Sequence, residues 1–147
     1  MRLANLISHL VVVFAASLGS CSSHAAMLSL PRYGIFVYSD FCVSPMSGDL
    51  GGSRISLHRF WDGDSLVYEY TDGSTHALVA EELTVDVAAR TVHFKVRQPD
   101  GGTAQLSGQF SKDGQALILR GALFDDPKKS YKLKRISNFA TPVPACK

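Results

Sequence analysis

The segment from Thr91 to Phe110 constrains the fold most strongly, because apolar and polar side chains alternate on both sides of a short turn. A period of two places one set of side chains on each face of a β-strand. Asp100-Gly101-Gly102 lies between the two halves and supplies the positive-φ residues that a tight turn needs. The apolar faces consist of Val92, Phe94 and Val96, then Ala104, Leu106, Gly108 and Phe110. The segment therefore predicts an antiparallel β-hairpin.

The same pattern recurs along the chain, with Asp-Gly turns at Asp62, Asp72, Asp100 and Asp113. Strand-like stretches cover residues 33–39, 54–61, 66–71, 91–97, 103–110, 116–123 and 131–135. Residues 75–86 fit one or two helical turns, but alternation of Leu83, Val85 and Val87 favours a strand. About eight short strands joined by short connections predict an all-β fold. We expect a single antiparallel up-and-down meander that forms a closed or nearly closed barrel.

The first residues are typical of an export signal. A basic start, Met1-Arg2, precedes the apolar run Leu10–Leu18, which is shorter than the roughly 20 residues that span a bilayer. We therefore predict a signal peptide over residues 1–20, with an alternative end at 25 or 26. Residues 21–30 then form a tether and residues 31–147 form the β-barrel domain.

Two cleavage sites compete at the end of this signal. Leu18-Gly19-Ser20-Cys21 resembles a bacterial lipobox, which would make Cys21 the lipidated first residue. Ser23-His24-Ala25 instead has the small residues that ordinary signal peptidase requires. Both routes predict an exported protein, in the periplasm or lipid-anchored to the cell envelope. Membrane attachment is expected only if Cys21 is acylated.

Three cysteines leave one pair once Cys21 is lipidated or removed. Cys42 and Cys146 are then expected to form a disulfide, because an oxidising compartment favours it. Two unpaired buried thiols are the alternative. The loop closed by this bond is nearly the whole domain, and chain-entropy models assign such loops about 4.7 kcal/mol.

The charge of the chain is unevenly distributed. Residues 40–86 hold nine acidic and two basic residues, whereas residues 87–147 hold eleven basic and four acidic ones. One interpretation is that the two halves face each other in one sheet, where opposed charges are mildly stabilising. The other is a basic surface that meets an anionic partner. The whole-chain balance of 15 basic to 13 acidic residues gives no reason to expect a nucleic-acid partner.

The strongest basic run is Lys128–Arg135, where Lys132 and Lys134 share one face of a strand. This run either solubilises the last strand or contacts an anionic lipid, a glycan or an acidic envelope protein. A basic patch results if the fold brings it beside the polar face of residues 91–97. The candidate patch is His93, Lys95, Arg97, Lys132 and Lys134.

No catalytic, cofactor-binding or metal-binding residue is predicted. The chain has no Gly-x-Ser-x-Gly and no His-Glu-x-x-His motif. Asp62, Asp64 and Asp72 lack the spacing of a calcium loop, so turn formation explains them better. Two cysteines without a nearby histidine make a poor zinc site.

Parts of the chain resemble a group of small exported bacterial proteins that have no assigned function. The similarity lies in Tyr38–Cys42, Ser47–Gly52 and Pro142–Cys146. The size and expected barrel also resemble calycin-like proteins and the periplasmic lysozyme inhibitors. The inhibitors' Ser-Gly-x-x-Tyr motif is not met, because Ser47–Gly51 lacks the aromatic residue. This second resemblance is one of architecture, which does not fix function.

These features favour a non-enzymatic binding or inhibitor module of the cell envelope. Such a module predicts a loop that stands out from the barrel, and the turn-rich stretch Val43–Gly52 is the candidate. The alternatives are a small-ligand carrier of calycin type and a hydrolase with an unrecognised site. Both alternatives predict an interior cavity lined by polar residues.

Overall fold

The computed structural model describes residues 30–147, apart from 122, 124, 125 and 127. The predicted signal peptide, Cys21 and residues 21–29 of the predicted tether lie outside this range. The described residues form ten strands and no helix, and so they include no helix long and apolar enough to cross a bilayer. The strands are β1 (Gly34–Ser39), β2 (Cys42–Val43), β3 (Leu50–Gly51), β4 (Ser53–Arg59), β5 (Asp64–Thr71), β6 (Thr75–Asp86), β7 (Thr91–Arg97), β8 (Thr103–Phe110), β9 (Ala116–Arg120) and β10 (Ser130–Ile136).

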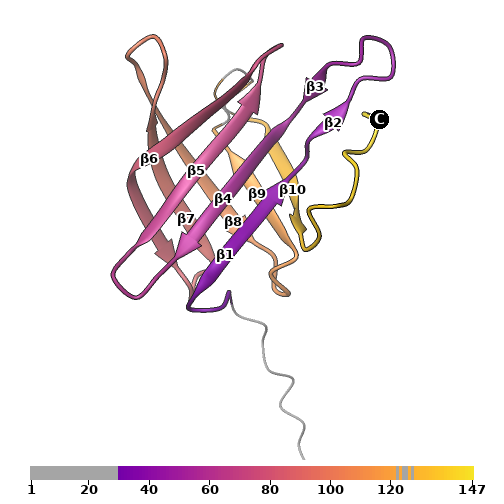
Figure 1. The fold of residues 1–147 in the computed structure, drawn as a ribbon. Helices are drawn as coiled ribbons and strands as arrows, with labels where there is room; N and C mark the ends of the chain where they lie inside the picture. The colour runs from indigo at the N-terminus through magenta and orange to yellow at the C-terminus, as the bar shows by residue number, and fades with distance from the viewer. Residues whose placement is uncertain (1–29, 122, 124–125, 127) are drawn as a thin grey trace, which may run out of the picture.

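Eight of these strands close into one antiparallel barrel in the order β1-β10-β9-β8-β7-β6-β5-β4. Each strand therefore pairs with its neighbour in the sequence, and β1 closes the sheet by pairing with β10 (Figure 1). This arrangement confirms the predicted up-and-down barrel. Closure removes the unpaired edges that an open sheet would expose.

The predicted hairpin is formed by β7 and β8. Phe94 lies opposite Leu106 and Val92 lies opposite Gly108, so both apolar faces point into the barrel. Gln98 donates its backbone N–H to the carbonyl of Gly102 at 2.8 Å, which closes the turn as the Asp-Gly-Gly sequence predicts.

Three segments differ in detail from the expectation. Residues 75–86 form a single strand with a register shift between Ala80 and Glu82, which breaks the simple alternation. β9 ends at Arg120 because Gly121 adopts a φ of +81°. The stretch Val43–Gly52, together with Cys42, forms a small hairpin of its own, β2–β3, outside the barrel.

The barrel interior is filled by side chains from every barrel strand except β6, whose apolar residues are only partly buried. The buried cluster is Leu30, Phe36, Tyr38, Ile55, Leu57, Leu66, Tyr68, Tyr70, Val92, Phe94, Val96, Leu106, Phe110, Leu117, Leu119 and Leu133. Tyr38 donates its hydroxyl to the carbonyl of Gly114 at 3.0 Å and so ties β1 to the β8–β9 turn. Leu30, which the sequence analysis assigns to the tether, is 7% exposed and belongs to this core.

Candidate functional site

The chain leaves the barrel after β1 at a corner built around Asp40. Asp40 donates its backbone N–H to Ser53 at 3.1 Å, and its Oδ1 accepts the Ser53 N–H at 2.7 Å. Gly52 lies against this corner with a φ of +100°, and a Cβ there would lie 2.8 Å from the Asp40 carbonyl oxygen. Only glycine therefore fits, and the corner directs residues 41–52 away from the barrel.

The β2–β3 hairpin continues the direction of β1 and β4 beyond the barrel (Figure 1). Its base pairs Cys42 with Gly51 and Val43 with Leu50. Ser44 donates its backbone N–H to Asp49 at 2.8 Å and accepts that of Gly48 at 2.9 Å, which orders the loop. The Oγ of Ser44 also accepts the Ser47 N–H at 3.2 Å.

Met46 lies at the tip of this ordered loop and is 96% exposed. A large apolar side chain that is exposed to water in this way does not stabilise the fold by burial. Its burial can instead stabilise a complex with a partner. No sequence pattern marks this residue alone, because Ser-Pro-Met-Ser-Gly is also typical of an ordinary surface turn.

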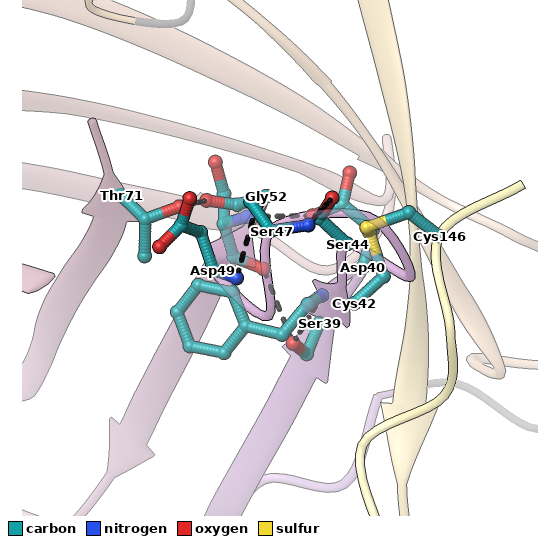
Figure 2. Close-up of a disulfide and its surroundings, with 11 residues drawn as sticks. Ser39, Asp40, Cys42, Ser44, Ser47, Asp49, Gly52, Thr71 and Cys146 are labelled. Atoms are coloured by element: carbon teal, nitrogen blue, oxygen red, sulfur yellow. Dashed lines mark hydrogen bonds between the residues drawn. A yellow bond between two sulfur atoms is a disulfide. The ribbon is translucent and has the colours of Figure 1, made fainter. Parts of the chain in front are cut away.

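The predicted disulfide between Cys42 and Cys146 is confirmed. Figure 2 shows how it joins the base of the hairpin to the C-terminal tail. Two backbone hydrogen bonds reinforce it, from Val43 N–H to Pro144 at 2.8 Å and from Cys146 N–H to Val43 at 2.9 Å. Val43 and Ala145 form a parallel bridge. We refer to residues 137–147, held in this way along the outside of the barrel, as the strap.

A groove of about 550 Å³ lies between the strap and the barrel wall. We call it the strap groove. Its lining comes from the end of β1, from β4, β10 and the strap, and both cysteines contribute. The residues are Ser39, Asp40, Phe41, Cys42, Arg54, Lys132, Lys134, Arg135, Ile136, Ser137, Asn138, Thr141, Pro142, Val143, Pro144, Ala145, Cys146 and Lys147.

Two ionisable groups in the groove are already engaged by the fold. Burial raises the pKa of the Asp40 carboxyl, and the hydrogen bond from the Ser53 N–H partly opposes this effect. Arg54 forms a two-pronged ion pair with Glu69, which raises the pKa of the guanidinium. The Arg54 guanidinium also stacks over the Phe41 ring, 5.3 Å from its centroid.

The structure separates the candidate basic patch into two groups. His93, Lys95 and Arg97 share the outer face of β7, and Lys132 and Lys134 share that of β10, with β8 and β9 between them.

The first group is largely neutralised, because Lys95 pairs with Glu82 at 2.7 Å and Arg97 with Glu81 at 2.8 Å. Acidic and basic halves of the chain thus face each other across β6 and β7. The second group lines the strap groove.

A second concavity of about 590 Å³ lies over β6–β9. Polar side chains from neighbouring strands line it, including His93, Ser107 and Arg120. Cross-strand pairing places Ser107 between the other two.

Several other polar side chains contact neighbours within the part of the chain described. Asp64 pairs with Arg59 at 3.2 Å, and Asp72 contacts the His76 ring at 2.9 Å. His58 lies edge-on to the Phe60 ring. No group of three or more His, Cys, Asp or Glu side chains is placed to hold a metal ion among the described residues.

Comparison with models of known families finds no match, and neither curated proteins nor solved structures include a similar chain. We therefore infer the function from the geometry of the hairpin, the strap and the groove.

Proposed function

We propose that this protein is an exported, non-enzymatic binding module of the cell envelope that inserts the β2–β3 hairpin into a recess of a partner protein. The observation that carries the proposal is Met46, 96% exposed at the tip of a hydrogen-bonded hairpin. Inhibition of an enzyme by occupation of its cleft is the specific form that we favour. The predicted signal peptide supports a partner in the envelope.

The construction of the hairpin suits this role. Its base is held to the strap by the Cys42–Cys146 bond, and its loop is ordered by hydrogen bonds of Ser44. A loop already ordered before binding loses less conformational entropy on association. Methionine is flexible and polarizable, so its side chain adapts to an apolar pocket.

A photo-cross-linking experiment tests the proposal. A benzophenone amino acid replaces Met46, the cells that make the protein are illuminated, and adducts in the envelope fraction are identified by mass spectrometry. We expect one discrete protein partner. The matched control places the same residue at Val79, which is 66% exposed on the outside of β6, and should give no such adduct.

The outcome that contradicts the proposal is an absence of adducts at position 46, or the same adducts at positions 46 and 79. With the partner identified, Met46→Asp should weaken binding by about tenfold or more, because buried apolar anchors dominate such interfaces. If the partner is an enzyme, the wild-type protein should inhibit it and Met46→Asp should inhibit it less.

A further inference from the structure

The strap groove has an excess of positive charge. Five basic residues and one acidic residue line it. Arg54 is paired with Glu69, and the Arg135 guanidinium stacks over the Phe36 ring, 5.1 Å from its centroid. Lys132, Lys134 and Lys147 contribute the remaining positive charge.

These three lysines have little to neutralise them. Lys132 acts electrostatically on Asp113, in the β8–β9 turn. Among the described residues, Lys134 and Lys147 have no ion-pair partner. The acidic residue in the groove, Asp40, accepts a hydrogen bond from the Ser53 N–H at 2.7 Å. An anionic group in the groove therefore meets ammonium groups that are free to pair with it.

The groove also has an apolar lining. Phe41 and Ile136 belong to the barrel side, and Pro142, Val143 and Pro144 belong to the strap. Proline has no backbone N–H, so this part of the strap offers few donors to a polar ligand. The apolar part of the lining therefore suits a hydrocarbon chain.

We propose that the strap groove binds a small amphiphile that has one anionic group and one apolar chain. The anionic group pairs with Lys134 and its neighbours, and the chain lies against Val143 and the flanking prolines. The groove volume of about 550 Å³ is in the range of roughly 300–1,000 Å³ that small-molecule sites occupy.

The strap also determines the size of the occupant. It is fixed at one end by β10 and at the other by the Cys42–Cys146 bond and the hydrogen bonds of Val43. A strap held at both ends limits how far the groove can widen around an occupant. The site is distinct from the hairpin tip, so this inference does not depend on the proposed function.

The proposal differs from a calycin-type carrier in where the ligand binds. A calycin-type carrier would hold its ligand inside the barrel, whereas the described interior is occupied by the buried side chains of the core. The strap groove instead lies outside the wall.

Fluorescence titration with dansyl-undecanoic acid, an amphiphile with one carboxylate, tests this inference. The probe is added to the purified, oxidised protein below its micelle-forming concentration, and saturable enhancement of dansyl emission is expected. Lys134→Glu should raise the Kd by about tenfold or more, because a charge-assisted contact is lost and a repulsive charge is introduced. The matched control is Lys112→Glu, which makes the same charge change outside the groove.

Competition separates the two parts of the ligand. Decanoate should displace the probe, whereas acetate, which lacks the chain, and decylamine, which has the opposite charge, should not. Val143→Asp should weaken probe binding as well, because it places a carboxylate in the apolar lining.

Equal affinity of the probe for the wild type, Lys134→Glu and Lys112→Glu would overturn the inference, as would displacement by decylamine. Met46→Asp should leave probe binding unchanged, and Lys134→Glu should leave the cross-links at position 46 unchanged. Failure of one proposal is therefore distinguishable from failure of the other.

Discussion

At Gly108 the barrel interior leaves no room for a side chain. A Cβ at this position would lie 2.7 Å from Cδ1 of Leu117 and 2.9 Å from Cγ1 of Val92. Both neighbours are fully buried, and Val92 is β-branched, so neither can turn aside at low cost. The hairpin register places Gly108 on the apolar face, and the close contacts there leave no space for a larger residue.

We therefore expect Gly108→Ala to lower the free energy of unfolding by about 1–3 kcal/mol, as overpacked cores do. Urea titration followed by circular dichroism measures the change. The matched control is Gly51→Ala, because a Cβ at Gly51 would meet its nearest atom at 3.9 Å and no unusual φ is required. Loss of unfolded-chain entropy should stabilise both variants alike, so equal changes in the free energy of unfolding would contradict the packing explanation.

Two aspartates should respond to pH in opposite directions. Burial raises the pKa of Asp40, so the folded state binds a proton more tightly than the unfolded state, and its contribution to stability is lost as pH rises above about 3.9 through the folded pKa. The Ser111 hydroxyl and the Gln115 N–H lower the pKa of Asp113. Its contribution is present above about pH 3.9 and is lost as pH falls through the folded pKa.

Stability measured for the Asp→Asn variants from acid to neutral pH tests this assignment. Asp40→Asn retains an acceptor for the Ser53 N–H, so its stability relative to the wild type should increase toward neutral pH. Asp113→Asn loses a favoured charge, so its stability relative to the wild type should decrease over the same range. The assignment of Asp40 is wrong if both variants change with pH in the same direction.

At the scale of elements, alternation and turn chemistry predict most of the strands. The β7–β8 hairpin is determined locally, because Asp100-Gly101-Gly102 and the two apolar faces agree on one register. β6 is less certain from sequence, because the shift between Ala80 and Glu82 interrupts its alternation. Residues 75–86 form a strand because they pair with β5 on one side and with β7 on the other.

The hairpin and the strap groove depend on contacts that sequence patterns do not encode. β2 and β3 are two residues each, too short for a periodic signal. The groove joins residues near 40 to residues near 145, and counting cysteines predicts this contact but not the space beneath it. The candidate basic patch fails to form a single surface because two strands separate its halves, which only the strand order reveals.

At the scale of the whole molecule, the barrel is weakest where its first and last strands meet. β1 pairs with β10 over three residue pairs, against six with β4, and this is the shortest register between neighbours in the barrel. Cys42 lies shortly after the end of β1, and Cys146 lies near the end of the strap that follows β10. The disulfide thus links the segments that follow β1 and β10, the two strands whose pairing in the barrel is shortest.

Hydrogen exchange distinguishes two ways in which this bond could stabilise the fold. The cysteines are separated by 104 positions in the sequence. If the bond acts only by restricting the unfolded chain, reduction lowers the free energy of global unfolding by about 2–5 kcal/mol and affects the most protected amides equally. If the bond also holds β1 against β10, reduction allows these two strands to separate while the other strands stay paired.

We expect the second behaviour: after reduction, amides of residues 37–39 and 134–136 should exchange faster than those of β5, whereas in the oxidised protein the two sets should differ little. The double variant Cys42→Ser/Cys146→Ser should behave like the reduced protein, which controls for effects of the reductant. A uniform loss of protection over both sets would show that the pairing of β1 with β10 holds without the bond. In that case the disulfide would act through the unfolded state alone, and the hairpin and the strap would owe their positions to the backbone hydrogen bonds of Val43.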